Sequence, residues 1–209
     1  MQNLNDIYHQ VPPDYWDSSY KNNIFQWLWH NIRFRALRKI TKDINDGSNV
    51  LDVGCGSGFS IEKTLSGNFN VYGIDTTEEV ISYAKKMRPD YHFQVGHAES
   101  LPFEDNFFDA IFYLDVIEHL KDPFLSLKEA RRVLRPEGIV IILVAKENHP
   151  LFKIIWWAWK KMKGRVWEDA HLWIFDEDNL SKMIINAEFN TFKIHKTHFG
   201  MSLLVVLKK

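Results

Sequence analysis

Short apolar runs alternate with amphipathic segments along most of the chain. Apolar runs of four to eight residues predict buried strands, and apolar residues at three-to-four-residue spacing predict helices. The predicted strands cover 49–53, 69–74, 91–95, 107–114, 138–145, 189–195 and 201–207, and the predicted helices cover 22–40, 58–65, 77–87, 123–134 and 176–187. This alternation predicts an α/β fold with a mostly parallel sheet and helices on both faces.

The last two predicted strands are joined by only a few residues, including Gly200. A parallel crossover needs a dozen or more residues, so this pair is predicted to be antiparallel. The sheet should therefore contain one antiparallel strand near the C-terminus. Residues 1–20 carry turn formers and are predicted to form an irregular arm.

We divide the chain at the Asp46-Gly47 turn. Residues 1–45 are expected to be an N-terminal arm and helix that cap the site, and residues 46–209 the main domain. An insertion rich in aromatic and basic residues is expected at about 148–175.

A glycine-rich loop follows the first predicted strand. Gly54, Gly56 and Gly58 come directly after it, and the next strand ends in Asp75. Glycines allow a ligand to approach the backbone, and a carboxylate about 20 residues downstream suits ribose hydroxyls. A dinucleotide fingerprint would place its third glycine at Phe59, and no Lys or Arg lies between residues 50 and 62. The loop therefore favours a nucleoside cofactor without phosphate groups.

Several further motifs follow in order: Gly73-Ile-Asp75, Ala98-Glu-Ser-Leu-Pro-Phe103, Asn106-Phe-Phe-Asp-Ala110, Ile117-Glu-His-Leu120 and Arg132-Val-Leu-Arg-Pro-Glu-Gly138. Together with Asp52-Val-Gly-Cys-Gly-Ser-Gly58, this series resembles the class I S-adenosylmethionine-dependent methyltransferases, in their ubiquinone/menaquinone-biosynthesis-like branch. The resemblance covers about 48–145. It implies a Rossmann-like, doubly wound sheet of seven strands, S-adenosylmethionine as cofactor, S-adenosylhomocysteine as product, and methyl transfer as the reaction.

The resemblance also implies roles for individual residues. The three glycines of the loop would pass beneath the methionine and ribose parts of the cofactor. Asp52 would help to hold the methionine amine, and Asp75 would accept hydrogen bonds from the ribose hydroxyls. The full predicted cofactor set is Asp52, Gly54, Cys55, Gly56, Gly58, Asp75, Thr76, His97, Ala98, Glu99 and Leu114.

His97 departs from the family pattern, which usually has an aspartate that accepts from the adenine amine. A neutral imidazole can accept through one ring nitrogen, whereas a protonated one cannot. His97 therefore contacts adenine or points to solvent, and the Ala98 amide offers another adenine contact. Glu99 is more typical of a loop carboxylate than of a ligand.

Asp115-Val-Ile-Glu118-His119 is open to two interpretations. The segment resembles the metal-binding part of some O-methyltransferases, but that pattern needs a further histidine, with His149 and His171 as candidates. The interpretation that we favour has no metal and places this segment in the acceptor pocket. His119 and His171 are then the candidate catalytic residues, as bases or orienting groups.

Tryptophans are confined to the flanks of the cofactor motifs. Three of the eight lie in residues 151–165, together with five basic residues and no acidic ones. This segment is predicted to be a lid over the acceptor, an interfacial helix at a membrane, or a packed helix with snorkelling lysines. The aromatic residues of the arm, Tyr8, His9, Tyr15, Trp16 and Tyr20, are candidates to close over the site.

The composition of the chain restricts the class of acceptor and the cellular compartment that we expect. A net charge of −1 argues against nucleic acid, whose phosphates require a basic surface. The aromatic flanks favour a small-molecule or lipid-like acceptor. One cysteine, no signal peptide and no membrane span predict a cytoplasmic protein, with peripheral membrane contact through 151–165 as an option. The alternative function is a non-catalytic S-adenosylmethionine-binding partner module.

Overall fold

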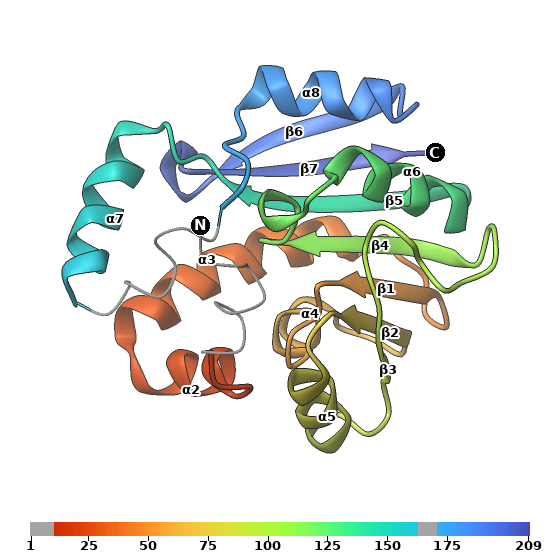
Figure 1. Cartoon of the computed structure of the whole chain (residues 1–209), viewed down its shortest axis with the longest axis horizontal. Helices are drawn as coiled ribbons and strands as arrows, with labels where there is room; N and C mark the ends of the chain where they lie inside the picture. The colour runs from red at the N-terminus through yellow and green to blue at the C-terminus, as the bar shows by residue number, and fades with distance from the viewer. Residues whose placement is uncertain (1–10, 163–170) are drawn as a thin grey trace.

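The computed structural model describes residues 11–162 and 171–209, with side chains over 11–157 and 171–209. A seven-stranded sheet in the order β3-β2-β1-β4-β5-β7-β6 forms its centre (Figure 1). The strands are β1 (Asn49–Val53), β2 (Asn70–Asp75), β3 (His92–Val95), β4 (Phe108–Leu114), β5 (Leu134–Ala145), β6 (Thr191–Thr197) and β7 (Ser202–Lys208). Only β7 runs antiparallel to its neighbours β5 and β6, which confirms the predicted fold class.

Alternate residues of the central strands bury their side chains on opposite faces of the sheet. One face packs against α3 (Ile24–Thr41) and α4 (Phe59–Thr64), and α5 (Glu78–Met87) covers β2 and β3. The other face packs against α6 (Pro123–Val133) and α8 (Glu177–Asn186). In β4, for example, Ile111 faces the second layer and Phe112 the first. The central strands β1, β4 and β7 are therefore mostly apolar, as expected for the part of a sheet that is covered on both sides.

The prediction of an irregular arm over residues 1–20 is wrong for its second half, because Tyr15–Asn22 form helix α2. The prediction used only the local turn formers, which include Pro12 and Pro13. Prolines are also common at the start of a helix, so they do not distinguish a turn from a helix start. Tertiary contacts hold this helix. The buried Asp17 carboxylate accepts from Ser57 Oγ at 2.7 Å and pairs with Arg88 at 2.9 Å. These contacts attach α2 to the glycine loop.

The strand order reverses between β1 and β4, which lie side by side at the middle of the sheet. The loops that follow β1 and β4 therefore leave in different directions and open a crevice at their carboxyl ends, where ligands of such sheets bind. Helix α7 (Pro150–Met162) and helices α2 and α3 lie beyond that edge of the sheet (Figure 1).

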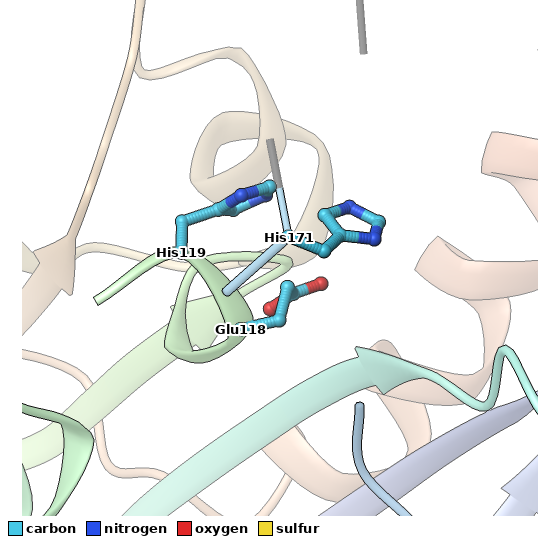
Figure 2. A group of neighbouring side chains, drawn as sticks. All are labelled: Glu118, His119 and His171. Atoms are coloured by element: carbon cyan, nitrogen blue, oxygen red, sulfur yellow. The ribbon is translucent and has the colours of Figure 1, made fainter. Parts of the chain in front are cut away.

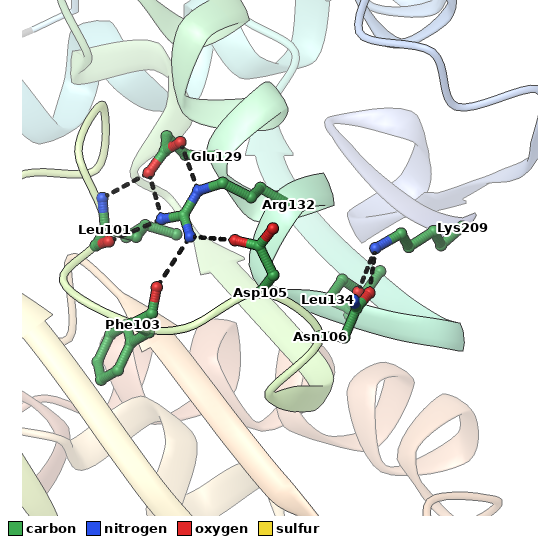
Figure 3. A network of polar contacts seen from close by, with 8 residues as sticks. All are labelled: Leu101, Phe103, Asp105, Asn106, Glu129, Arg132, Leu134 and Lys209. Carbon is green, nitrogen blue, oxygen red and sulfur yellow. Dashed lines mark hydrogen bonds and ion pairs between the residues drawn. The ribbon is translucent and has the colours of Figure 1, made fainter.

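Arg132 fixes the loop that borders this crevice (Figure 3). Its guanidinium donates to the carbonyl oxygens of Leu101 and Phe103, both at 2.9 Å, and pairs with Asp105 and Glu129. Glu129 also accepts from the Leu101 amide at 2.9 Å. The first residue of the Arg132–Gly138 motif thus anchors the loop that begins at the crevice.

In the described parts of the chain, no helix is both long enough and apolar enough to cross a membrane.

Candidate active site

A cavity of about 480 Å³ lies at the carboxyl ends of the parallel strands. It is lined by the glycine loop, by the residues that follow β2, β3 and β4, and by α2, α3 and α7. Of the predicted residues, those that line it are Asp52, Gly54, Cys55, Gly56, Asp75, Thr76, His97, Ala98, Glu99, Leu114, His119 and His171. One cavity thus brings together both the predicted cofactor set and the predicted catalytic pair.

Gly58 is the member of the predicted set that does not line the cavity. Gly54, Gly56 and Gly58 all have positive φ, between +53° and +78°. A Cβ on Gly54 would meet the Val116 side chain at 2.6 Å, and a Cβ on Gly58 would meet Phe93 at 2.6 Å. A Cβ on Gly56 would meet only Trp16, at 3.8 Å. Gly54 and Gly58 therefore serve close packing of the fold, whereas the space beside Gly56 is available to a ligand.

Asp75 links β2 to the glycine loop. Its carboxylate accepts from the backbone amides of Gly56 and Thr77, each at 3.0 Å. Burial raises the pKa of Asp75, and these two hydrogen bonds oppose the rise. Two carboxylate oxygens have room for further donors, so Asp75 remains able to accept from a ligand hydroxyl.

Asp52 is buried at the end of β1, and among the described residues its Oδ1 atom has no hydrogen-bond partner. Burial, with a smaller contribution from Asp75, raises its pKa to about 8. A buried carboxylate without a partner is costly, and a cationic ligand group would remove that cost. The side chain therefore fits the ammonium group of an amino-acid moiety.

The predicted adenine side lies after β3. His97 lines the cavity while its side chain stays exposed, so it is placed at the rim, and Ala98 is buried beneath it. Glu99 accepts from the Asp122 amide at 3.4 Å, which agrees with a loop carboxylate. In the glycine loop, the Cys55 thiol is buried, and the Cys55 amide donates to the Ile74 carbonyl of β2 at 2.9 Å.

Two segments far apart in sequence meet at the other end of the cavity (Figure 2). Glu118 and His119 belong to the 3₁₀ turn η1 (Ile117–His119) after β4, and His171 follows α7. The amides of Leu172 and Trp173 donate to the Glu118 carbonyl at 2.9 and 3.1 Å. These bonds bring the imidazole rings of His119 and His171 to a centroid distance of 4.7 Å. The structure therefore joins the two residues predicted as catalytic.

Charged groups surround this histidine pair. Glu118 is 2% exposed, its Oε2 atom has no hydrogen-bond partner within residues 11–157 and 171–209, and burial raises its pKa to about 8. Burial alone would lower the pKa of His171, but its Nδ1 contacts the Glu147 carboxylate, and the net effect is a raised pKa. Asp115 pairs with the buried Arg33 at 2.5 Å. A base paired with a carboxylate in this way can take up a proton from a reacting group.

Aromatic side chains form the wall between the two ends. Trp16 on α2, Trp29 on α3 and Trp156 on α7 all line the cavity. Phe152, Trp156 and His171 stack in a row, with centroid distances of 5.7 and 6.1 Å. An apolar or aromatic molecule would find its contacts along this row.

Helix α7 does not bury the apolar face that its sequence pattern predicts. Leu151, Ile154 and Ile155 lie on the predicted apolar face and are exposed, whereas Phe152 is buried. The side chains of Trp159 and of the basic residues after 157 lie outside the described residues, as do Tyr8 and His9. Membrane contact through this segment stays a prediction.

Sequence reasoning missed Trp29, His30, Arg33 and Glu147. Trp29 and Arg33 are spaced by four on the same helix face as the buried Leu37, and this spacing was the available signal. Glu147 follows the end of β5, where functional residues gather in such sheets. His30 is buried, and burial together with Arg33 and His198 lowers its pKa to about 3, so it is neutral.

Comparisons with known proteins find similarity to methyltransferases. The family model described as "Methyltransferase domain" matches residues 51–142. The chain is similar to the demethylmenaquinone methyltransferases of Staphylococcus saprophyticus (25% identical over 97% of this chain and 94% of the relative) and Staphylococcus haemolyticus (27% over 88% and 85%). A demethylmenaquinone methyltransferase of Renibacterium salmoninarum is 36% identical over 51% of this chain and 44% of the relative.

Solved structures share the fold. A chain of the complex between the Haloferax volcanii Trm112 methyltransferase activator and a methyltransferase superposes with a TM-score of 0.77 at 18% identity, covering 99% of this chain and 97% of that one. A Thermotoga maritima SAM-dependent methyltransferase, described as a possible histamine N-methyltransferase, gives 0.72 at 20% identity, with 99% and 100% covered.

Proposed function

We propose that the chain is a class I S-adenosylmethionine-dependent methyltransferase that transfers a methyl group from S-adenosylmethionine to a small-molecule or lipid-like acceptor. The observation that carries the proposal is the arrangement of the cavity. An unpartnered buried carboxylate lies at one end, a histidine pair at the other, and aromatic side chains between them.

The residues present fit the cofactor. Asp52 would hold the ammonium group, the loop around Gly56 would support the methionine and ribose parts, and Asp75 would accept from the ribose hydroxyls. When bound, S-adenosylmethionine supplies a methyl group on a sulfonium, whose sulfur leaves as a neutral thioether. The task left to the chain is to position the acceptor, exclude water and accept a proton.

The acceptor end provides these functions. His119 and His171 lie where a polar group of the acceptor would enter, and Glu147 orients the His171 ring. Trp29 and Trp156 would contact an apolar body and keep water from it. The methyltransferases named above act on demethylmenaquinone, an acceptor of this apolar class, which supports the proposal.

Binding calorimetry on the full chain, followed by a transfer assay, tests the proposal. We expect S-adenosylhomocysteine to bind and NAD not to bind. The Asp75→Ala variant should lose about 100-fold in affinity for S-adenosylhomocysteine, because hydrogen bonds to a charged group contribute roughly 1.5–3 kcal/mol each. Asp90→Ala, which removes an exposed carboxylate outside the cavity, is the matched control.

Labelled S-adenosylmethionine should then transfer its methyl group to demethylmenaquinone or to another apolar acceptor in a metabolite panel. Binding of NAD in place of S-adenosylhomocysteine would overturn the cofactor assignment. Binding of S-adenosylhomocysteine without transfer to any acceptor of the panel would favour the non-catalytic partner module.

A further inference from the structure

The sequence favoured a metal-free interpretation of this segment, but the structure brings three ligand side chains together, and we propose that Glu118, His119 and His171 bind one divalent transition-metal ion at the acceptor end of the cavity. The site itself stands on the arrangement of these side chains. Its use, to hold an oxygen of the acceptor, rests on the proposed function.

The three side chains offer ligand atoms that all lie within 4.8 Å of one another. The ligands of a tetrahedral ion with bonds of about 2.1 Å lie roughly 3.4 Å apart, so side-chain adjustments of about 1 Å would close the site. Figure 2 shows Glu118 and His119 leaving one turn while His171 approaches them from a separate segment.

The backbone holds this arrangement in place. Two amides of the segment that carries His171 donate to the Glu118 carbonyl, and the Trp173 indole donates to the Leu120 carbonyl at 2.9 Å. Fifty-one residues separate His119 from His171 in the sequence, so only the fold unites the three ligands. Ligands held before the ion arrives lose less entropy on binding.

Glu118 supplies the first independent indication of a ligand. A carboxylate oxygen that is buried at 2% exposure and lacks a hydrogen-bond partner carries a desolvation cost. Buried carboxylates commonly offset that cost by pairing with a cation. Within the described residues the nearby Arg33 is engaged with Asp115, so it leaves the Glu118 oxygen without an ion pair.

His171 supplies the second independent indication of a ligand. Its Nδ1 contacts the Glu147 carboxylate, so an ion would bind through Nε2. Histidines that bind metals usually pair their second ring nitrogen with a carboxylate or carbonyl, and this fixes the tautomer and the ring orientation.

The donor set indicates the kind of ion. Two imidazoles and one carboxylate are typical of Zn²⁺, Mn²⁺ or Fe²⁺, whereas Mg²⁺ and Ca²⁺ prefer oxygen ligands alone. Three protein ligands leave a coordination position open. Because all three residues line the cavity, that position faces the space for the acceptor. An acceptor oxygen bound there would lose its proton to water more readily, since the cation stabilises the oxyanion.

The test uses the untagged full chain after treatment with a chelator. Co²⁺ is titrated in, with its visible absorption bands as the readout, and Zn²⁺ then competes for the site. We expect one equivalent to bind, and Mg²⁺ to bind at least 100-fold more weakly than Zn²⁺. His171→Gln and Glu118→Gln should each weaken Zn²⁺ binding by about 100-fold or more, because the loss of a ligand costs more than the loss of an outer-shell partner, which typically costs about 10- to 100-fold.

His195→Gln is the control, because it removes an exposed histidine on β6, away from the cavity. Circular dichroism separates unfolding from loss of the site, and His171→Gln is the safer variant, since His171 is only half-buried on a connecting segment. Absence of stoichiometric binding, or binding equally weakened by His195→Gln, would overturn the proposal and leave a metal-free histidine pair. S-adenosylhomocysteine affinity of the chelated protein tests the proposed function separately.

Discussion

The two ends of the cavity are built in different ways. The cofactor end uses consecutive pieces of chain at the tips of β1 and β2, and its main contacts come from backbone amides, glycines and two aspartates. The acceptor end uses side chains from α3, the η1 turn, α7 and the segment after it. The first end depends on backbone geometry that few sequences allow, whereas the second depends on how distant segments pack.

This difference explains what each end can recognise. Backbone groups present the same donors whatever side chains surround them, so we expect the proposed cofactor end to keep one specificity. The side chains proposed to contact the acceptor, Trp29 and Trp156, change with each substitution, so this part of the wall can be adapted to other apolar molecules. Variants that test this difference between the two ends should therefore be compared in stability, in affinity for the cofactor and in KM for the acceptor.

The largest effect is expected from two alanine substitutions within the glycine loop. Gly58→Ala places a Cβ at 2.6 Å from Phe93 with φ at +78°, which should cost about 3 kcal/mol in free energy of unfolding. Gly56→Ala meets only Trp16 at 3.8 Å and should cost about 1 kcal/mol, from the left-handed backbone alone. Thermal unfolding should show Tm decreases of roughly 6–12 °C and 2–4 °C.

Ligand binding should reverse that order. Gly56→Ala, beside the open space, should weaken S-adenosylhomocysteine binding at least about tenfold, since its methyl group occupies the ligand's approach. Gly58→Ala should retain most of the affinity in the folded fraction, because Gly58 does not line the cavity. Equal losses of affinity in both variants would show that the loop acts as one unit.

A smaller effect is expected from pH, through Asp52. The pKa of Asp52 is raised to about 8 in the folded protein, so the protonated form is favoured by folding. Its stabilising contribution is complete below about pH 4 and is lost as the pH rises through about 8. An ammonium ligand favours the ionised carboxylate, so binding should release a proton in this window.

The affinity for S-adenosylhomocysteine should accordingly rise by up to about tenfold per pH unit between pH 6 and 7. Calorimetry in buffers of different ionisation enthalpy measures the proton release. Because the pKa of Glu118 is also raised, the slope of the wild type must be compared with that of Asp52→Asn, which should lack this contribution. If the wild type and Asp52→Asn release the same number of protons on binding, Asp52 does not bind the ammonium group.

The sequence was sufficient for the regular parts of the molecule. Apolar runs bounded by glycines located all seven strands, and the ordered motifs predicted residues that line one cavity, because both signals depend on local chemistry. Helix α2 was not predicted, since it is held by Asp17 against Ser57 and Arg88, which are 40 and 71 residues away. Glu147 was missed for the same reason, because only the fold brings it to His171. On α7, the burial of Phe152 in place of Leu151 depends on the wall against which the helix packs.

The smallest effect is expected at Trp156, and it tests whether the two ends act separately. Trp156 lines the cavity and stacks on His171, whereas the neighbouring Trp157 is exposed and does not line it. Trp156→Ala should raise KM for an apolar acceptor about fivefold, since an aromatic contact contributes roughly 1 kcal/mol, and should leave S-adenosylhomocysteine affinity unchanged. Trp157→Ala, the matched control, should change neither quantity. If Trp156→Ala instead lowers kcat at constant KM, the indole positions His171 and does not contact the acceptor. A loss of cofactor affinity in the same variant would show that the wall couples the two ends of the cavity.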